Sequence, residues 1–251
     1  MSSERTGRSS SPAPQGEART LGLLTIGQSP RRDVTPDIQA YLRALPGLQA
    51  LRVLEAGALD GLAPAAIRRL APAGGEPALV TRLRTGKAVL VAERAIPPLL
   101  EGQTRRLVEQ GAEVLALLCT GNLPEIRAPV PILQPQPLMR HLVAAAFPGA
   151  RLGVIVPLPE QTADARRRWE AFARTLTPEG AAAVESASPY SPDPGALSAA
   201  AASLRAWGAG VVVLDCMGYT PAMRRAVREI CAAPVILPRT VVAGALAEVL
   251  S

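Results

Sequence analysis

Residues 107–124, LVEQGAEVLALLCTGNLP, and residues 204–221, LRAWGAGVVVLDCMGYTP, follow one pattern. In each, a helix-like segment ends at Gly-Ala, and an apolar run then leads to a cysteine, with glycine and proline shortly after it. Glycine commonly ends helices, and an unbroken apolar run is typical of a strand buried on both faces. A second pair, LGLLTIGQSPRRD (21–33) and LGVIVPLPEQTAD (152–164), repeats a strand followed by a proline-bearing polar turn. We therefore expect two copies of one structural unit.

Short apolar runs alternate with longer amphipathic segments along the chain, as in KAVLVAE (87–93) followed by LLEGQTRRLVEQGA (99–112). This alternation indicates βαβ units. The predicted fold class is α/β, with two similar lobes, each a parallel sheet flanked by helices, and a ligand crevice between the lobes. We expect residues 1–19 to form a disordered tail, residues 20–145 an N-terminal lobe completed by a helix at 240–251, and residues 146–239 the second lobe.

Composition and charge exclude several classes of protein. The net charge of +6 is compatible with nucleic-acid binding, but aromatic residues make up only 3% of the chain and the arginines are scattered, as on solvated helix faces. No apolar stretch is long enough to span a membrane, and the N-terminus lacks the apolar core of a signal peptide. Three cysteines far apart do not make a disulfide framework. These features predict a cytoplasmic protein without nucleic-acid or membrane partners.

Cys119 and Cys216 lie where buried strands are predicted to end, and open parallel sheets bind ligands outside those ends. If the lobes face each other, the two thiols reach one crevice from opposite sides. Moving a proton at a carbon beside a carboxylate requires a base on one face and an acid on the other, and two cysteines supply both without metal or cofactor. The following segments, expected to start helices, provide binding groups for the carboxylate, namely Thr120, Gly121, Asn122, Gly218, Tyr219 and Thr220.

The turn at residues 27–33, GQSPRRD, is the most polar of the predicted strand exits. Thr25, Gln28 and Ser29 are predicted to contact the ligand there, and an arginine of this turn is a candidate clamp for a carboxylate. In the matching turn of the second half, Thr162 is the predicted ligand contact. Helix capping is the alternative role for polar residues in these turns.

Each of these side chains also has an interpretation without chemistry. Cysteine is among the most buried residue types, so an inert core thiol is the alternative for Cys119 and Cys216 and the preferred interpretation for Cys231. Asp215 is equally compatible with a structural anchor, and beside the thiol it would raise the pKa of Cys216. The only histidine, His141, is expected to be packed or on the surface, and no zinc-ligand spacing is present.

Four segments resemble the AroM family, namely LGLLTIGQSPRRDVTPDI (21–38), LLCTGN (117–122), GVIVPLPEQ (153–161) and LDCMGYTPAMR (214–224). The similarity covers nearly everything after residue 20. AroM proteins are grouped with the aspartate/glutamate racemase superfamily, which includes hydantoin racemases, maleate isomerases and arylmalonate decarboxylases. The resemblance implies two α/β lobes with the site between them and no metal or organic cofactor. Position by position, it assigns the two superfamily thiols to Cys119 and Cys216.

The sequence departs from the racemase motifs at defined positions. Thr25 and Ile26 stand where amino-acid racemases carry Asp-Ser, and Gly218 stands where glutamate racemases carry histidine. We therefore expect a small carboxylate or ring carbon acid other than an amino acid as substrate. The predicted activity is cofactor-independent proton transfer of the racemase, isomerase or decarboxylase type, and a homodimer is compatible with it. The alternatives are a carboxylate-binding or regulatory protein that kept the cleft and lost turnover, and a purely structural role.

Overall fold

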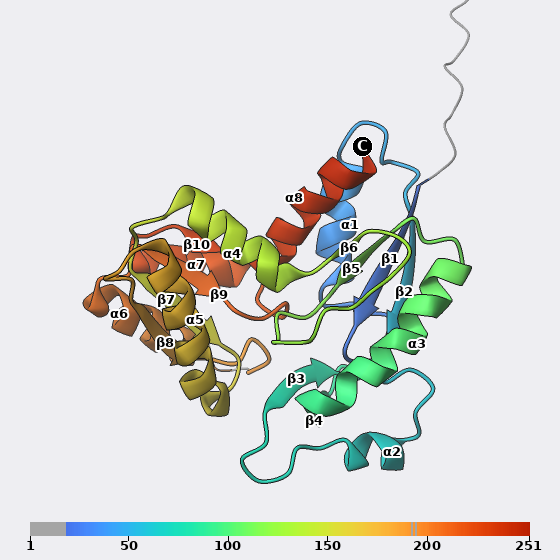
Figure 1. The fold of residues 1–251 in the computed structure, drawn as a ribbon, viewed down its shortest axis with the longest axis horizontal. Coiled ribbons are helices and arrows are strands. Elements are labelled where there is room, and N and C mark those ends of the chain that lie inside the picture. The colour runs from blue at the N-terminus through green and yellow to red at the C-terminus, as the bar shows by residue number, and fades with distance from the viewer. Residues whose placement is uncertain (1–18, 192, 194) are drawn as a thin grey trace, which may run out of the picture.

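The computed structural model describes residues 19–191, 193 and 195–251, and it contains two four-stranded parallel sheets that lie beside one another (Figure 1). In spatial order, the first sheet consists of β2 (Arg52–Gly57), β1 (Thr20–Thr25), β5 (Val114–Leu117) and β6 (Ile132–Leu133). The second consists of β10 (Val235–Ile236), β9 (Val211–Leu214), β7 (Leu152–Val156) and β8 (Ala182–Ser186). The predicted α/β class with two similar lobes is confirmed. Residues 1–18 of the predicted disordered tail lie outside the described residues.

The two sheets repeat one topology and one register. When β1, β2, β5 and β6 are matched with β7, β8, β9 and β10, the strand orders coincide. Leu21 of β1 pairs with Val114 of β5, and Leu152 of β7 pairs with Val211 of β9. Leu21 corresponds to Leu152, and Val114 to Val211, in the repeated sequence segments. The sequence repeat therefore reflects a structural repeat.

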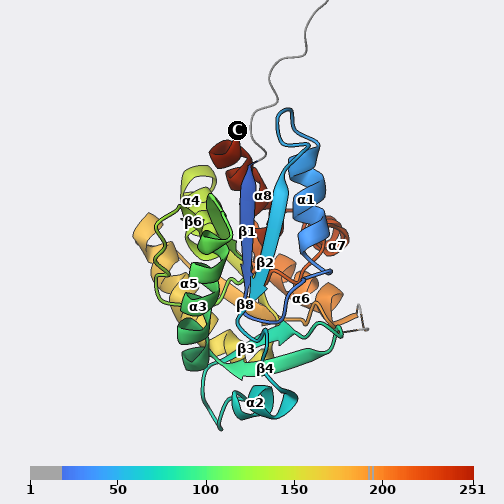
Figure 2. The ribbon, with the colours of Figure 1, turned by 90° about the vertical axis from the view of Figure 1, so that its right-hand side faces the viewer.

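Helices cover both faces of each sheet, as Figures 1 and 2 show. The first sheet carries α1 (Thr35–Arg43) and α8 (Pro238–Leu250) on one face and α3 (Ile96–Glu109) on the other. The second carries α4 (Pro135–Ala146) and α5 (Thr162–Leu176) on one face and α6 (Gly195–Trp207) and α7 (Pro221–Cys231) on the other. Each helix buries an apolar stripe, as Ile38 and Leu42 do one turn apart on α1. In the described part of the chain, no helix is long and apolar enough to cross a membrane.

The last helix, α8, returns to the first sheet, where Val242 and Leu246 are buried in its core. Arg239 at the start of α8 is only 2% exposed. Its guanidinium donates to the carbonyl oxygens of Met217 at 2.7 Å and Asp33 at 3.0 Å, and it pairs with Asp37 at 2.6 Å. One buried arginine therefore joins the loop after β9 to the loop before α1.

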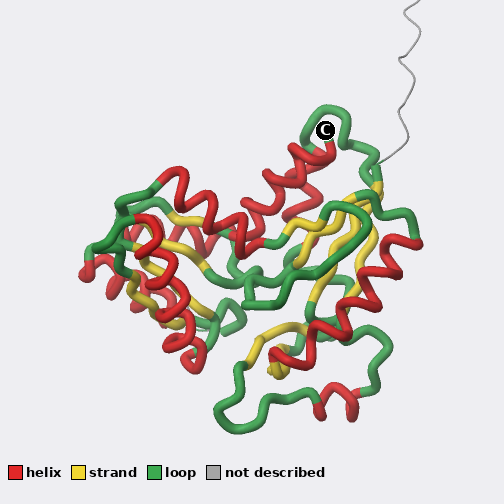
Figure 3. The backbone as a smooth tube through the Cα atoms, viewed as in Figure 1, coloured by secondary structure: helices red, strands yellow, loops and turns green. Residues whose placement is uncertain are grey.

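One predicted strand has a different role. The segment KAVLVAE, expected to be a parallel strand of the sheet, forms β4 (Ala88–Ala92), which pairs antiparallel with β3 (Ala78–Arg82) in a separate two-stranded hairpin. Only residues 83–87 join the two strands, with Gly86 at a φ of 86°, and a connection this short requires an antiparallel pair. The hairpin and the short α2 (Pro64–Arg69) lie below the first sheet in Figures 1 and 3.

Candidate active site

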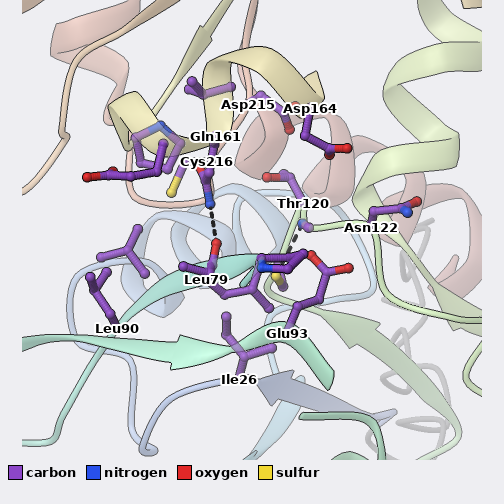
Figure 4. A pocket seen from close by; sticks show the side chains of 18 of the residues that line it. Ile26, Leu79, Leu90, Glu93, Thr120, Asn122, Gln161, Asp164, Asp215 and Cys216 are labelled. Carbon is purple, nitrogen blue, oxygen red and sulfur yellow. Dashed lines mark hydrogen bonds between the residues drawn. The ribbon is translucent and has the colours of Figure 1, made fainter. Parts of the chain in front are cut away.

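A cavity of about 390 Å³ lies at the C-terminal ends of the strands of both sheets. The exits of β5 and β9 bring Cys119 and Cys216 to its lining, and the hairpin and the start of α5 complete it (Figure 4). This is the edge at which parallel sheets bind ligands. The predicted approach of both thiols to one crevice therefore matches the geometry of the chain, whereas their chemical roles stay a prediction.

The sulfur atoms of Cys119 and Cys216 have equivalent backbone contacts. Cys119 and Cys216 are 7% and 8% exposed. The amide N–H of Gly121 lies 3.3 Å from the sulfur of Cys119, and that of Gly218 lies 3.4 Å from the sulfur of Cys216. A backbone N–H aimed at sulfur favours the thiolate form, which is the nucleophilic and basic form of cysteine.

The charges around Cys216 differ from those around Cys119. Burial raises the pKa of the Cys216 thiol, while the Gly218 amide, the Arg31 guanidinium and the Tyr190 hydroxyl lower it, and Asp215 raises it. Burial also raises the pKa of Tyr190, so this phenol stays a neutral donor near Cys216. Arg31 supplies a nearby positive charge that stabilises a thiolate at Cys216.

Among the described residues, those that act most strongly on the pKa of Cys119 include no cation. Burial raises the pKa of its thiol to about 12, the Gly121 amide opposes this shift, and negative charge on Cys216, Glu93 or Asp215 adds to it. The chain after Cys119 also runs without a helix as far as β6, so the predicted helix start at residues 120–122 is wrong. Cys119 is therefore held as the protonated thiol at neutral pH.

Arg31 is fixed in place by the turn that follows β1. It is 3% exposed and forms a two-pronged ion pair with Asp33, with both N–O distances at 2.8 Å. A third nitrogen donates to the Thr25 hydroxyl at 3.0 Å, and Tyr190 lies 3.4 Å away, under the guanidinium of Arg82. The predicted arginine clamp for a ligand carboxylate is thus occupied by a carboxylate of the chain itself.

Most of the polar residues predicted in the first turn serve the fold. Thr25 accepts from Arg31, and Gln28 is bonded to the carbonyl oxygen of Leu59 and to the amide of Arg84. Ser29 donates to Asp60 at 2.6 Å. None of the three predicted residues lines the cavity. Their hydrogen bonds tie β1 to the loop after β2 and to the hairpin.

The predicted residues of the second half are also held by local bonds. Thr162 donates to the carbonyl oxygen of Pro159, Tyr219 donates to that of Ala187, and Thr220 caps α7 through the amide of Met223. A further member of the set, Gly218, packs where a Cβ would lie 2.5 Å from the Tyr190 hydroxyl. The cavity lining includes none of these four residues.

Three predicted binding residues do line the cavity, namely Thr120, Gly121 and Asn122. The structure adds others that the sequence did not single out as ligand contacts, among them Leu79, Glu93, Gln161 and Tyr190. Gln161, in the short η2 (Pro159–Gln161), donates across the cavity to the carbonyl oxygen of Ala78 at 2.7 Å (Figure 4). The turn sequence TGK at residues 85–87 was a local signal for the hairpin. The position of the hairpin beside the two thiols could not be predicted from the local sequence.

The remaining chemical candidates lie elsewhere. Cys231 is buried and lies 3.2 Å from the carbonyl oxygen of Ala201, away from the cavity lining. His141 is exposed on α4, with its ring 2.8 Å from the carbonyl oxygen of Pro137. Across residues 19–191, 193 and 195–251, no three His, Cys, Asp or Glu side chains gather as metal ligands.

Comparison with known proteins places the chain in a family. The sequence model described as "AroM protein" matches residues 21–250. The chain belongs to the AroM family. A search among curated proteins finds no match for this AroM-family chain.

Solved structures share the fold of this AroM protein. An allantoin racemase from Klebsiella pneumoniae has a TM-score of 0.57 at 18% identity, covering 93% of this chain and 87% of that one. A glutamate racemase from Francisella tularensis, solved with D-glutamate, has a TM-score of 0.58 at 13% identity, with coverages of 92% and 81%. The maleate isomerase Iso from Pseudomonas putida S16 has a TM-score of 0.56 at 15% identity, with 93% of both chains covered. At these identities the likeness establishes a racemase-like fold.

Proposed function

We propose that this AroM protein catalyses cofactor-independent proton transfer at the acidic carbon of a small carboxylate or ring carbon acid. The observation behind the proposal is that equivalent strand exits of two repeated units place one thiol each in the lining of a single cavity. Proton transfer of this kind needs an acid and a base positioned about the same carbon, and no further reactive group. The racemases that share the fold support the same reaction class by analogy.

The unequal charges assign the two roles. Cys216, near Arg31 and Tyr190, is the base, and Cys119, whose surroundings favour the thiol, is the acid. The Cys216 thiolate takes the proton from the α-carbon, and the electron pair of the broken C–H bond moves into the carboxylate as an enediolate. Cys119 then gives its proton to the carbon from the other side, which leaves a Cys216 thiol and a Cys119 thiolate. The protein and substrate together neither gain nor lose a proton.

The carboxylate of the substrate belongs beside the exit of β5. Thr120, Gly121 and Asn122 line the cavity there and offer a hydroxyl, backbone amides and a side-chain amide. The hairpin contributes Leu79, Val80 and Leu90 on another wall. We therefore assign the substrate class as a small carboxylate or ring carbon acid that carries an apolar part.

Carboxylate binding without turnover is the second candidate. One observation favours it, namely that burial raises the pKa of both thiols and thus opposes formation of a thiolate. In that case the protein would bind the same ligands in the same cavity, and neither cysteine would be required for binding.

The test is proton exchange measured in deuterated water by NMR. The substrate panel is a set of simple 2-substituted carboxylates with an apolar substituent and allantoin as a ring carbon acid, with D-glutamate, L-aspartate and maleate as compounds outside the proposed class. We expect incorporation of deuterium, or formation of a new isomer, with at least one compound, and a loss of at least about a thousandfold in Cys119→Ser and Cys216→Ser. Cys231→Ser is the matched control, because this thiol is buried but does not line the cavity.

The outcomes separate the candidates. Exchange that persists in both cavity variants would reject the thiol assignment. Saturable binding of a panel compound without exchange, unchanged in both variants, would favour the binding protein.

A further inference from the structure

Asp215 has one carboxyl oxygen in use and one without a partner. The residue is 5% exposed, lines the cavity and immediately precedes Cys216 (Figure 4). Its Oδ2 accepts from the indole N–H of Trp169 at 2.9 Å. Its Oδ1 is buried and forms no hydrogen bond of normal geometry with a described residue, although the Thr120 hydroxyl acts on the same carboxyl group. A buried polar atom without a partner is unfavourable, and one in a cavity wall indicates a partner that enters the cavity.

The first half of the chain has Leu118 at the equivalent position before its cysteine. The repeat therefore does not require a carboxyl group at this point of the fold. Trp169, fully buried on α5, fixes Oδ2 and leaves Oδ1 unpaired in a residue that lines the cavity. We propose that Asp215 is a substrate-binding residue that, as a neutral carboxylic acid, donates a hydrogen bond from Oδ1 to a carboxylate oxygen of the ligand.

The surroundings favour the neutral acid. Burial raises the pKa of Asp215, while the Trp169 indole, the Arg168 guanidinium, the Thr120 hydroxyl and Arg140 oppose that shift to a smaller extent. The charged and titratable groups that face Asp215 are Arg168 from α5, Arg140 from α4, Cys119 from the exit of β5, and Cys216 and Tyr219 from its own loop. A carboxylic acid kept neutral by an enclosed site can donate a hydrogen bond at neutral pH.

This inference rests on the proposed function. Asp215 is the group that stabilises the negative charge of the enediolate intermediate. When the α-proton leaves, negative charge builds on the carboxylate oxygens, and a donor already aimed at them stabilises that charge. An O–H donor to an ionised oxygen forms a short, strong hydrogen bond. An ionised Asp215 raises the pKa of the adjacent Cys216 and so opposes formation of its thiolate. A neutral Asp215 avoids this repulsion.

Two substitutions separate this role from its rivals. Asp215→Asn keeps an oxygen for Trp169 and turns an amide N–H₂ donor toward the cavity. Asp215→Leu copies Leu118 and removes the donor. The probe is acetate, which contains the carboxylate alone and needs no turnover to be detected. Binding is followed through the indole signals of ¹⁵N-labelled Trp169 and Trp207, where Trp207 is an internal control because it stacks on Arg151 away from the cavity.

We expect acetate to shift the Trp169 signal and not that of Trp207, with Asp215→Asn within about threefold of the wild-type affinity and Asp215→Leu at least tenfold weaker. Wild-type affinity should fall as pH rises through the pKa of Asp215, and Asp215→Asn should lack that fall. Equal binding by Asp215→Leu would overturn the inference, and so would the absence of saturable acetate binding to the wild type. If Asp215→Asn binds as weakly as Asp215→Leu, the carboxyl group acts as an ionised acceptor and the inference is wrong.

A measurement without ligand guards against misfolded variants. The carboxyl ¹³C signal of Asp215, assigned by its loss in Asp215→Asn, should titrate at a higher pH than that of an exposed aspartate, and a pKa at or below the usual value would overturn the inference. Acetate binding through Asp215 in a Cys119→Ser/Cys216→Ser double variant would support the inference whether or not the wild type exchanges protons. Failure of the proposed reaction is thereby distinguished from failure of this inference.

Discussion

The segments that follow β5 and β9 have similar backbone geometry, but the charged side chains around them differ. Two residues after each strand lies a buried cysteine whose sulfur faces the amide of a glycine two residues later. Around them, Leu118 in the first half corresponds to Asp215 in the second, and Arg31 acts on Cys216 but not on Cys119. The duplicated fold positions two thiols, and the unequal side chains give the thiols different acidities.

The charge that distinguishes Cys216 comes from the opposite half of the molecule. Arg31 follows β1 of the first sheet, yet it lowers the pKa of the thiol that follows β9 of the second. Its ion pair with Asp33 and its contact with Tyr190 hold the guanidinium in place. The asymmetry of the site therefore depends on how the two halves meet, and four measurements test it.

The largest effect is expected from Arg31→Met. Removing the guanidinium leaves Asp33 without its buried partner, and breaking such a pair typically lowers the free energy of unfolding by about 3–5 kcal/mol. It should also slow alkylation of Cys216, because the pKa of the thiol rises. Arg32→Met, at an exposed neighbouring position, is the control. Denaturant titration checks the stability, and equal behaviour of the two variants would contradict the assigned role of Arg31.

The second effect concerns Asp215 and pH. Because the pKa of Asp215 is raised in the folded state, the folded protein keeps a proton that the unfolded chain has lost, so stability falls as pH rises between the unfolded and folded pKa values. Each pH unit in that window lowers the free energy of unfolding by about 1.4 kcal/mol. Asp215→Asn should show a flatter dependence between pH 4 and pH 8 in denaturant titrations. Parallel curves for the two proteins would show that Asp215 does not titrate in this way.

The third effect is unequal alkylation of the two thiols. With a pKa of about 12, Cys119 is a thiolate in only about one molecule per thousand at pH 9. In a Cys231→Ser background, iodoacetamide should modify Cys216 at least about tenfold faster than Cys119, as followed by peptide mass spectrometry. Equal rates, or faster modification of Cys119, would reverse the assignment of base and acid.

The smallest effect is expected from Gln161→Ala, which removes the hydrogen bond from Gln161 to Ala78. One such bond contributes about 0.5–1.5 kcal/mol, and its loss should speed alkylation of both thiols by a few-fold without changing their order. Gln49→Ala, at an exposed position, should leave both rates unchanged. A change in the order of the two rates would mean that Gln161 contributes to the asymmetry itself.

The repeat, the parallel sheets and the position of both cysteines could be predicted because their signals are local. The hairpin could not, since KAVLVAE looks the same whether its partner is a parallel strand or the segment just before it. Gln28 and Ser29 were predicted as ligand contacts from their polarity, but neighbouring backbone and Asp60 use their hydrogen bonds. Tyr190 and Gln161 enter the site only through long-range contacts, which depend on the mutual placement of the two halves.

The clamp formed by Arg239 has a consequence for how the protein is made. The guanidinium of Arg239 joins the loop after β9 to the loop before α1, and α8 also completes the core of the first sheet. A nascent chain synthesised only through Cys216 therefore still lacks one of the contacts that hold its two halves together. Full assembly must wait until the 13 residues of α8 have been added.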